Sequence, residues 1–175
     1  MLLFYSQQSN AQRDKIGLHF SGYKFAETKV APLFGFTYDR QFANNFGLET
    51  DLFFYTKKEN FSMLIEDKII NGVVVKKYYT NLPVLFKYHS RIVDFGIGPS
   101  FHIFTKWKQT SENNNAKIES VKESPAIRTG YLLKASKSFN ITEQIFLEPE
   151  IYFGAPQFFK NEYYGLGINL KYGLK

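Results

Sequence analysis

Hydrophobic and polar residues alternate strictly over the last dozen residues of the chain. From Tyr164 to Leu174 every even position carries a large apolar side chain, and every odd position carries glycine, asparagine or lysine. Because neighbouring side chains on a strand point to opposite faces, this pattern predicts a β-strand with one apolar face and one polar face. Transmembrane β-barrels are built from such strands, with the apolar face against lipid and the polar face lining the interior.

The same alternation recurs upstream and predicts eight strands in all, over residues 15–25, 30–42, 46–55, 78–89, 92–106, 127–139, 145–155 and 164–175. The connections alternate between tight and long, with tight ones at 43–45, 90–91 and 140–144 and long ones at 56–77 and 107–126. Short periplasmic turns and longer external loops are typical of outer-membrane barrels with an even number of strands. We therefore predict one domain, residues 12–175, folded as an all-β, eight-stranded, antiparallel up-and-down transmembrane β-barrel.

The first long connection contains a hairpin signal. Asn71-Gly72 lies between two apolar runs, as in a two-residue β-turn. Pairing the third and fourth strands around that turn leaves about eight surplus residues in the third strand. We place them at 56–62, where the run Lys57 to Asn60 forms a protrusion, so that the hairpin becomes an external extension. The second long connection contains Glu112–Asn115, a polar run typical of flexible loops.

Four prolines fall inside the predicted strands: Pro32, Pro83, Pro99 and Pro149. Proline has no N–H to give to the ladder, so it normally argues against a central strand. We expect local bulges to accommodate these four positions.

Composition supports strands rather than membrane helices. The 175 residues include 19 Phe, 12 Tyr and one Trp, so aromatics make up 18% of the chain. The mean hydropathy is nevertheless −0.29, and no apolar run approaches the roughly 18 residues of a membrane helix. Alternation of apolar and polar residues produces this combination of many aromatic residues and low mean hydropathy. The absence of cysteine excludes disulfides, thiolate metal sites and cysteine nucleophiles.

The net charge of +6 comes from scattered basic residues, with small clusters at Lys57-Lys58, Lys76-Lys77 and Lys106/Lys108. The aromatics lie at strand period on one face and are not interleaved with Arg and Lys, so we expect no nucleic-acid partner. The expected partners are outer-membrane lipid and lipopolysaccharide, whose anionic groups suit the basic clusters. A protein partner could also bind the external segments 57–77 and 107–126, for example by strand addition.

Alternation alone does not say which face points outward, since a soluble lipid-binding barrel turns its apolar face inward around a ligand. Here the polar face combines glycine with charges of both signs, which fits the narrow interior of an eight-stranded barrel. Charges in such an interior must compensate one another. The predicted interior network consists of Asp39, Glu49, Asp51, Lys87, Asp94, Lys134, Glu148, Glu150 and Lys171.

The apolar face is then predicted to contact lipid, with aromatic residues near the strand ends forming girdles at the membrane interfaces. The residues assigned to this face are Phe34, Phe36, Tyr38, Tyr88, Phe95, Phe101, Tyr164 and Tyr172.

Residues 1–11 are apolar at first and end in Ser9-Asn10-Ala11, with small residues at the two positions that a signal peptidase reads. A complete signal peptide also needs a basic start and a longer apolar core. We interpret residues 1–11 as the end of a signal peptide, or equally as a frayed N-terminal extension.

Glu148 and Glu150 share one face, as a catalytic carboxylate pair would, but we interpret them as members of the interior network. Ser100 and His102 are the remaining candidates for catalysis. They share the inner face of one strand, and Asp51 or Glu150 could lie across the barrel, as in an outer-membrane lipid-modifying enzyme with a serine nucleophile. The spacing is not diagnostic, and no Gly-x-Ser-x-Gly elbow is present. His19, His89 and His102 come from different strands, which argues against a shared metal site. We therefore predict no enzymatic activity, no cofactor and no metal.

Three motifs resemble one known family: Tyr79 to Tyr88, Phe95 to Pro99, and Gly165 to Tyr172. Together they look like the PorT-like outer-membrane β-barrels of Gram-negative bacteria of the Bacteroidota type. The resemblance implies location in the outer membrane and a role connected with secretion. Eight strands leave a filled interior rather than an open porin. We predict a small integral outer-membrane protein with a structural, adhesive or complex-accessory role.

Overall fold

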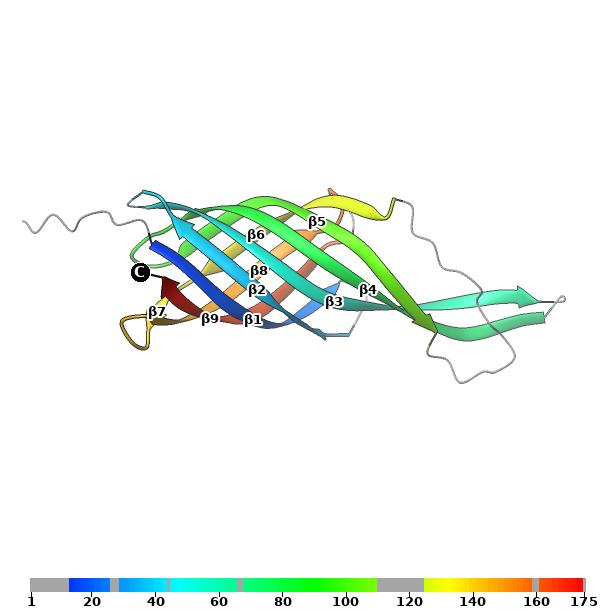
Figure 1. Cartoon of the computed structure of the whole chain (residues 1–175). Helices are drawn as coiled ribbons and strands as arrows, with labels where there is room; N and C mark the ends of the chain where they lie inside the picture. Colours follow the sequence, from blue (N-terminus) through cyan, green and yellow to red (C-terminus); the bar gives the residue numbers. More distant parts are fainter. Residues whose placement is uncertain are drawn as a thin grey trace, which may run out of the picture.

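The computed structural model describes residues 13–25, 29–43, 45–65, 68–109, 125–158 and 161–174. The regular structure in these ranges is β (Figure 1). The strands are β1 (Arg13–Phe25), β2 (Ala31–Gln41), β3 (Phe46–Ile65), β4 (Lys68–Tyr88), β5 (Asp94–Gln109), β6 (Ile127–Ser136), β7 (Phe139–Asn140), β8 (Ile145–Ala155) and β9 (Tyr163–Leu174). Within the described residues, no helix has the length and apolar character needed to cross a membrane.

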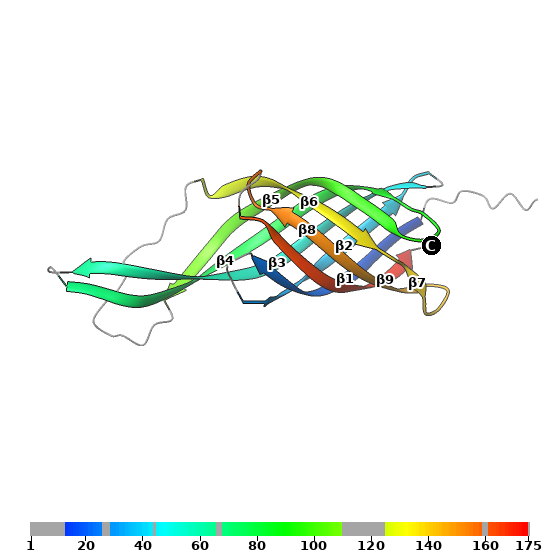
Figure 2. The ribbon, with the colours of Figure 1, turned by 180° about the vertical axis from the view of Figure 1, so that it is seen from behind.

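The strands close into a ring. Neighbouring strands pair antiparallel in the order β1 to β6, and then β6 pairs with β8, β8 with β9, and β9 with β1. The two-residue β7 follows β6 and pairs with β8, so the ring has eight positions. Figures 1 and 2 show the strands inclined to the long axis of the molecule, as closure of a sheet requires. The predicted eight-stranded antiparallel barrel is confirmed.

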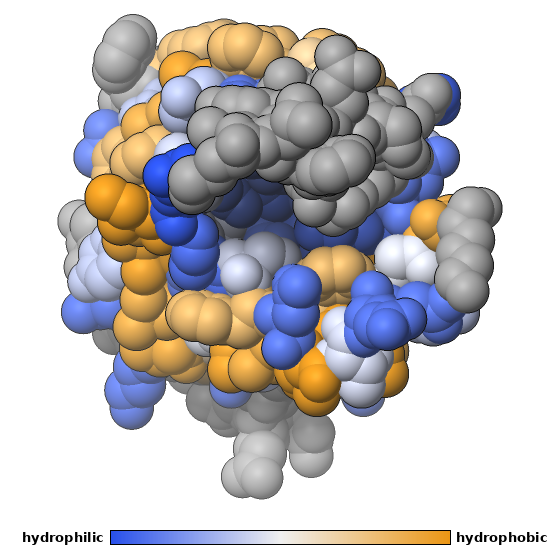
Figure 3. Space-filling view, turned by 90° about the vertical axis from the view of Figure 1, so that its left-hand side faces the viewer, coloured by the Kyte–Doolittle hydropathy of each residue, from blue (hydrophilic) through white to orange (hydrophobic). Residues whose placement is uncertain are grey.

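Exposure alternates along each strand as the sequence does. On β2, Phe34 and Phe36 are more than half exposed, whereas Leu33, Gly35 and Thr37 between and beside them are buried. The exposed residues face outward, and the buried ones fill the interior. Figure 3 looks along the barrel from the end where the C-terminus lies, and it shows hydrophobic residues on much of the rim with hydrophilic residues toward the centre.

The three tight connections lie at the end of the barrel that carries the C-terminus (Figure 1). In the β4–β5 turn, the Ser90 hydroxyl accepts hydrogen bonds from the backbone N–H groups of Ile92 and Val93. In the β7–β8 turn, the Thr142 hydroxyl accepts one from the N–H of Ile145 at 3.0 Å. Such side-chain to backbone bonds satisfy turn groups that have no ladder partner.

The opposite end differs from the prediction. The prediction of a turn at Asn71-Gly72 is wrong, because both residues lie inside β4. The β3–β4 ladder continues to the pair Ile65 and Lys68, with one register shift between Phe61 and Met63. There is accordingly no surplus protrusion at 56–62, and the segment 57–77 is mainly paired strand rather than loop. The ladder does not reverse at Asn-Gly, because a local turn preference was outweighed by continuous pairing with the strand beside it.

β5 also runs three residues beyond its predicted end, to Gln109, and stays paired with β4 up to Val75. β2 pairs with β3 only as far as Phe54, and β6 pairs with β5 only as far as Ile103. Past the barrel, β3, β4 and β5 therefore form a sheet over residues 55–65, 68–79 and 104–109, which we call the external sheet. It has three strands as far as the pair Val75 and Gln109, and within the described residues only β3 and β4 continue beyond that pair (Figure 1). The predicted flexible loop around 112–115 and the N-terminal segment 1–11 lie outside the described residues.

The prolines lie inside strands without bulges, contrary to expectation. Near Pro83 the β3–β4 ladder omits two pairs but keeps the same register on both sides, and the β4–β5 ladder does so near Pro99. The Thr50 hydroxyl donates to the Pro83 carbonyl at 3.0 Å. Pro32 precedes the first pair of β2 with β3, and Pro149 lies where the partner of β8 changes from β6 to β7. Each proline, which has no N–H group to donate, thus lies where a neighbouring ladder omits pairs, has not yet begun or changes partner.

Candidate functional site

The interior near the short turns contains an ion network centred on three lysines. Lys87 on β4 donates to three carboxylates, at 2.9 Å to Asp39 Oδ2, 2.6 Å to Glu49 Oε2 and 2.8 Å to Glu148 Oε1. Lys171 on β9 lies near the same three groups, at 3.2 Å from Asp39, 2.8 Å from Glu49 and 3.0 Å from Glu148. Two cations therefore share three carboxylates that come from β2, β3 and β8.

Lys134 on β6 extends the network along the barrel axis. Its Nζ lies 2.6 Å from Glu49 Oε1, 2.8 Å from Asp51 Oδ2 and 3.2 Å from Glu150 Oε2. Glu49 binds Lys134 with one oxygen and Lys87 with the other. This carboxylate consequently joins the two parts of the network into one.

The network is almost fully shielded from solvent. The side chains of the three lysines and of their carboxylate partners are at most 3% exposed. Removing a charge from water is costly, and the cost is offset only when each charge has close partners of opposite sign. The multiple short contacts supply those partners. They also tie β2, β3, β4, β6, β8 and β9 together across the interior.

One predicted member lies apart from the rest. Asp94 contacts His89 at 3.4 Å and accepts a hydrogen bond from the Ser90 N–H at 3.1 Å. It therefore stabilises the β4–β5 turn. His89 also lies 3.9 Å from Asp39, which places Asp94 beside the network but not in contact with its lysines.

Four further polar side chains complete the network, and sequence reasoning missed them as members. Ser136 and Ser138 donate to the two oxygens of Glu148, at 2.8 Å and 3.2 Å. The Asn169 amide donates to Glu150 and accepts from His19 Nδ1 at 2.8 Å. Ser136 and Asn169 lie on the polar faces of their strands, so the alternation along the sequence could have predicted that both point inward.

Nearer the external sheet the interior is aromatic instead of charged. Tyr55 and Tyr79 stack with ring centroids 5.1 Å apart, and Tyr23 and Phe25 pack edge-on or tilted against Tyr55 at 5.4 Å and 6.3 Å. Tyr163 packs against Phe25 at 5.4 Å. These rings fill the barrel between the ion network and the external sheet. This aromatic filling differs from the sequence-based prediction, which placed the aromatic residues on the outer face.

Ser100 and His102 are brought together by β5. His102 Nε2 lies 3.1 Å from Ser100 Oγ, and both side chains are buried. The other ring nitrogen contacts the Tyr55 hydroxyl at 2.9 Å. Asp51 and Glu150, the acids considered for a catalytic triad, instead bind Lys134. The pair is therefore one part of a buried hydrogen-bonded chain, with a tyrosine where a triad has a carboxylate.

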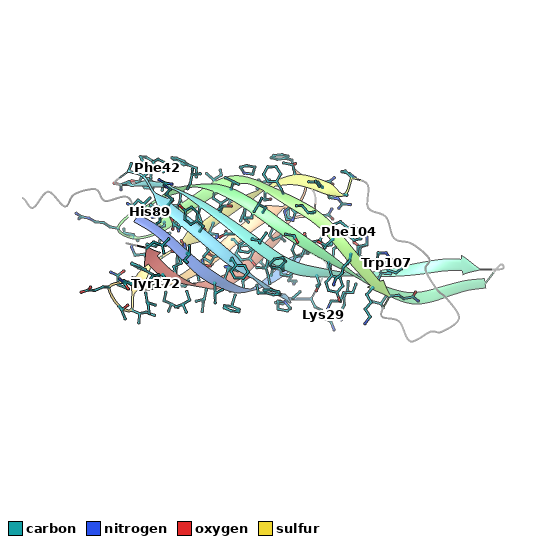
Figure 4. The ribbon with its side chains drawn as sticks, viewed as in Figure 1. Lys29, Phe42, His89, Phe104, Trp107 and Tyr172 are labelled. Atoms are coloured by element: carbon teal, nitrogen blue, oxygen red, sulfur yellow. The ribbon has the colours of Figure 1, made fainter. Side chains whose placement is uncertain are left out.

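The residues predicted to face lipid all point outward. Phe34, Phe36, Tyr88, Phe95, Tyr164 and Tyr172 are exposed, and Tyr38 and Phe101 are half-buried on the same face. Figure 4 shows Tyr172 near the end with short turns, and Phe104 and Trp107 near the other end, where the external sheet begins.

The inner face of the external sheet carries an ion pair cluster. Glu59 on β3 lies 3.1 Å from Lys57 and 2.6 Å from Lys77 on β4. Burial acts to raise the pKa of the Glu59 carboxyl, but hydrogen bonds from Lys77 and Lys57 together with their charges outweigh it and lower this pKa. Glu59 is consequently ionised at neutral pH and links the two strands.

Comparison with known proteins gives similarity in structure only. No family model and no curated protein sequence matches the chain. The outer membrane protein OprG from Pseudomonas aeruginosa is similar with a TM-score of 0.62, at 12% identity over 94% of this chain and 96% of that one. This chain has the fold of the small outer-membrane β-barrels.

Two other solved structures are similar to this chain in the same way. The N-terminal β-barrel domain of Pseudomonas aeruginosa OprF has a TM-score of 0.52 at 14% identity, covering 92% of this chain and 99% of that one. Ail, the attachment invasion locus protein of Yersinia pestis, in complex with the heparin analogue sucrose octasulfate, has a TM-score of 0.50 at 12% identity, covering 93% and 99%. At such identities the likeness establishes the fold alone.

Proposed function

We propose that this protein is an integral outer-membrane barrel of a Gram-negative bacterium that presents the external sheet at the cell surface, in a structural, adhesive or complex-accessory role. The observation that carries the proposal is the continuation of β3, β4 and β5 beyond a ring whose outer face is apolar. A ring of exposed Phe, Leu, Ile and Tyr side chains suits lipid, whereas paired strands beyond it suit contact with another molecule.

The interior supports an anchoring role rather than transport. Lys87, Lys134 and Lys171 and their carboxylates occupy the barrel where an open pore would need water. The aromatic rings around Tyr55 occupy the next level. We infer that the barrel is not an open porin.

An adhesive role has the support of one similar structure. Ail is an attachment protein, and its structure was solved with a sulfated sugar. The basic residues of the external sheet would suit an anionic partner in the same way. A role in secretion, which the resemblance to PorT-like barrels implies, stays a prediction, as does a protein partner at 57–77 and 107–126.

The alternative of a lipid-modifying enzyme is disfavoured by the surroundings of Ser100 and His102. Both are shielded from solvent, and His102 is held by Tyr55 rather than by a carboxylate. Release of fatty acid from phospholipid by the purified protein, abolished in Ser100→Ala, would instead support the enzyme.

Surface presentation can be tested by cysteine labelling, because the chain has no native cysteine. Lys58→Cys places a thiol on the external sheet, and Glu143→Cys places a matched exposed thiol in the β7–β8 turn. In intact cells a membrane-impermeant maleimide should label Lys58→Cys and leave Glu143→Cys unlabelled until the outer membrane is permeabilised. Labelling of Glu143→Cys alone would reverse the proposed orientation.

A further inference from the structure

The outer face of the external sheet carries a row of three lysines. Lys58 on β3 lies directly opposite Lys76 on β4, and Lys76 lies directly opposite Lys108 on β5. Paired residues on adjacent strands share a face, so the three side chains emerge on one side of the sheet. Lys58 and Lys108 are exposed, and Lys76 is half-buried.

A fourth lysine lies in the next row toward the barrel. Lys106 is opposite Tyr78, two residues along each strand from Lys108 and Lys76. Two cations lie close to the Tyr78 ring, with Lys76 Nζ 5.2 Å and Lys106 Nζ 5.1 Å from its centroid. The aromatic ring thereby holds two of the lysines in place on this face.

These four lysines have no acidic partner among the described residues, where the ion pairs of the external sheet involve Lys57, Lys77 and Glu59 on the other face. Like charges directly opposite each other on a sheet are destabilising. As far as the described residues go, the sheet therefore compensates its cations on the inner face and not on the outer face. An anion bound outside would relieve this repulsion.

The position of the row indicates where that anion lies. On the outer face of β4, the residues after Lys76 and Tyr78 toward the barrel are Thr80 and then Leu82, which begins the apolar exterior. On β5, Ile103 precedes Lys106 on the same outer face. Lys106 thus follows the apolar belt directly, and the row of Lys58, Lys76 and Lys108 lies one outer-face position further from the barrel, on the side where lipid headgroups follow the acyl chains.

We propose that Lys58, Lys76, Lys106 and Lys108, with Tyr78, form a binding site for the phosphate groups of an outer-leaflet lipid such as the lipid A part of lipopolysaccharide. The proposal rests on the proposed insertion in the outer membrane. Neighbouring strands are about 4.8 Å apart and residues two apart on a strand about 6.7 Å apart, so the four ammonium groups span an area that fits a headgroup with two phosphates. Lysine ammonium groups are suited to phosphate binding.

The test compares two triple variants that remove the same charge. Lys58→Gln/Lys76→Gln/Lys108→Gln removes the row, and the control Lys24→Gln/Lys29→Gln/Arg91→Gln removes three cations elsewhere. Each full-chain protein is purified in a neutral detergent, and its mobility shift on boiling establishes that the barrel is folded. Native mass spectrometry then measures binding of bisphosphorylated lipid A and of the same lipid without phosphates.

The wild type and the control should bind bisphosphorylated lipid A with equal affinity, and the row variant should bind it at least about tenfold more weakly. Lipid without phosphates should not distinguish the three proteins. If the row variant does not fold, Lys108→Glu alone replaces it, with an expected loss of about fivefold.

Equal affinity in the wild type and the row variant, or an equal loss in the control, would overturn the site. Binding of soluble heparin to the same lysines without binding of lipid A would assign them to a soluble polyanion and also overturn it. A wild-type protein that is soluble and shows no mobility shift would contradict the proposed function instead, so the two failures are distinguishable.

Discussion

Lys134 on β6 and Glu49 on β3 lie 2.6 Å apart although two strands separate them in the ring. The contact therefore crosses the interior instead of running along the wall. Glu49 also binds Lys87 and Lys171 through its other oxygen. This one carboxylate links every lysine of the network, so the interior behaves as a single charged unit.

Removing Lys134 should destabilise the barrel strongly. In Lys134→Met, Asp51 and Glu150 lose the lysine that each contacts, and breaking a buried pair in this way costs about 3–5 kcal/mol. Urea unfolding of the protein in lipid vesicles, followed by the mobility shift on gels, measures the change in free energy of unfolding.

The control for this variant is Lys29→Met, which makes the same substitution at an exposed position. It should change the free energy of unfolding by less than about 0.5 kcal/mol. Equal effects of the two substitutions would show that the interior contacts do not stabilise the barrel.

Two glycines that face the interior should respond differently to the same substitution. A Cβ at Gly130 would lie 1.7 Å from the backbone oxygen of Ala155, whereas a Cβ at Gly96 would lie 3.4 Å from the nearest atom, in the Leu85 side chain. Gly130→Ala should therefore cost about 1–3 kcal/mol by forcing β6 and β8 apart. Gly96→Ala should be neutral or slightly stabilising in the same urea titration. A tolerated Gly130→Ala would mean that β6 and β8 are less closely spaced at this point.

The Tyr55 hydroxyl should matter for stability. Tyr55→Phe removes the group that contacts His102 Nδ1 and leaves that buried nitrogen without this bond, which costs about 1–3 kcal/mol. Tyr88→Phe makes the same change on the exposed outer face and should have little effect. Thermal unfolding in detergent compares the two variants, and a larger loss in Tyr88→Phe would contradict the assignment.

The external sheet should loosen in acid. Because the folded pKa of Glu59 is below its unfolded value, ionised Glu59 stabilises the sheet above that unfolded value, and the contribution is lost as pH falls through the lowered pKa. Trp107 is the only tryptophan and lies opposite Lys77, so its fluorescence reports on this region. As the pH falls from 7 to below the lowered pKa of Glu59, the emission should change in the wild type and stay flat in Glu59→Gln. An identical change in both would assign the transition to another group.

The alternation of residue types was enough to predict the strands and the ring, because the period of two is a property of each strand by itself. The length of β3 and β4 was not predictable in the same way. Asn71-Gly72 has the local chemistry of a turn, but the ladder between the two strands extends past it. Local turn preference and long-range pairing conflict there, and only the structure shows which one prevails.

The alternation along each strand could also predict that Lys134 and Glu49 point inward, but not that they form an ion pair. Contacts across the interior depend on the stagger of strands around the ring, which no single strand encodes. The inward aromatics show a second limit. Tyr23 and Tyr55 occupy polar-face positions, where an amphipathic ring with a hydroxyl can fill space and still form hydrogen bonds.

We propose above all that the apolar outer face of the ring lies in the outer membrane. We would express the chain behind a full signal peptide, isolate outer membranes, and compare boiled and unboiled samples on a denaturing gel. We expect a protein that stays with the membrane after a carbonate wash and changes mobility on boiling. A protein recovered in the soluble fraction, with no change in mobility on boiling, would contradict it.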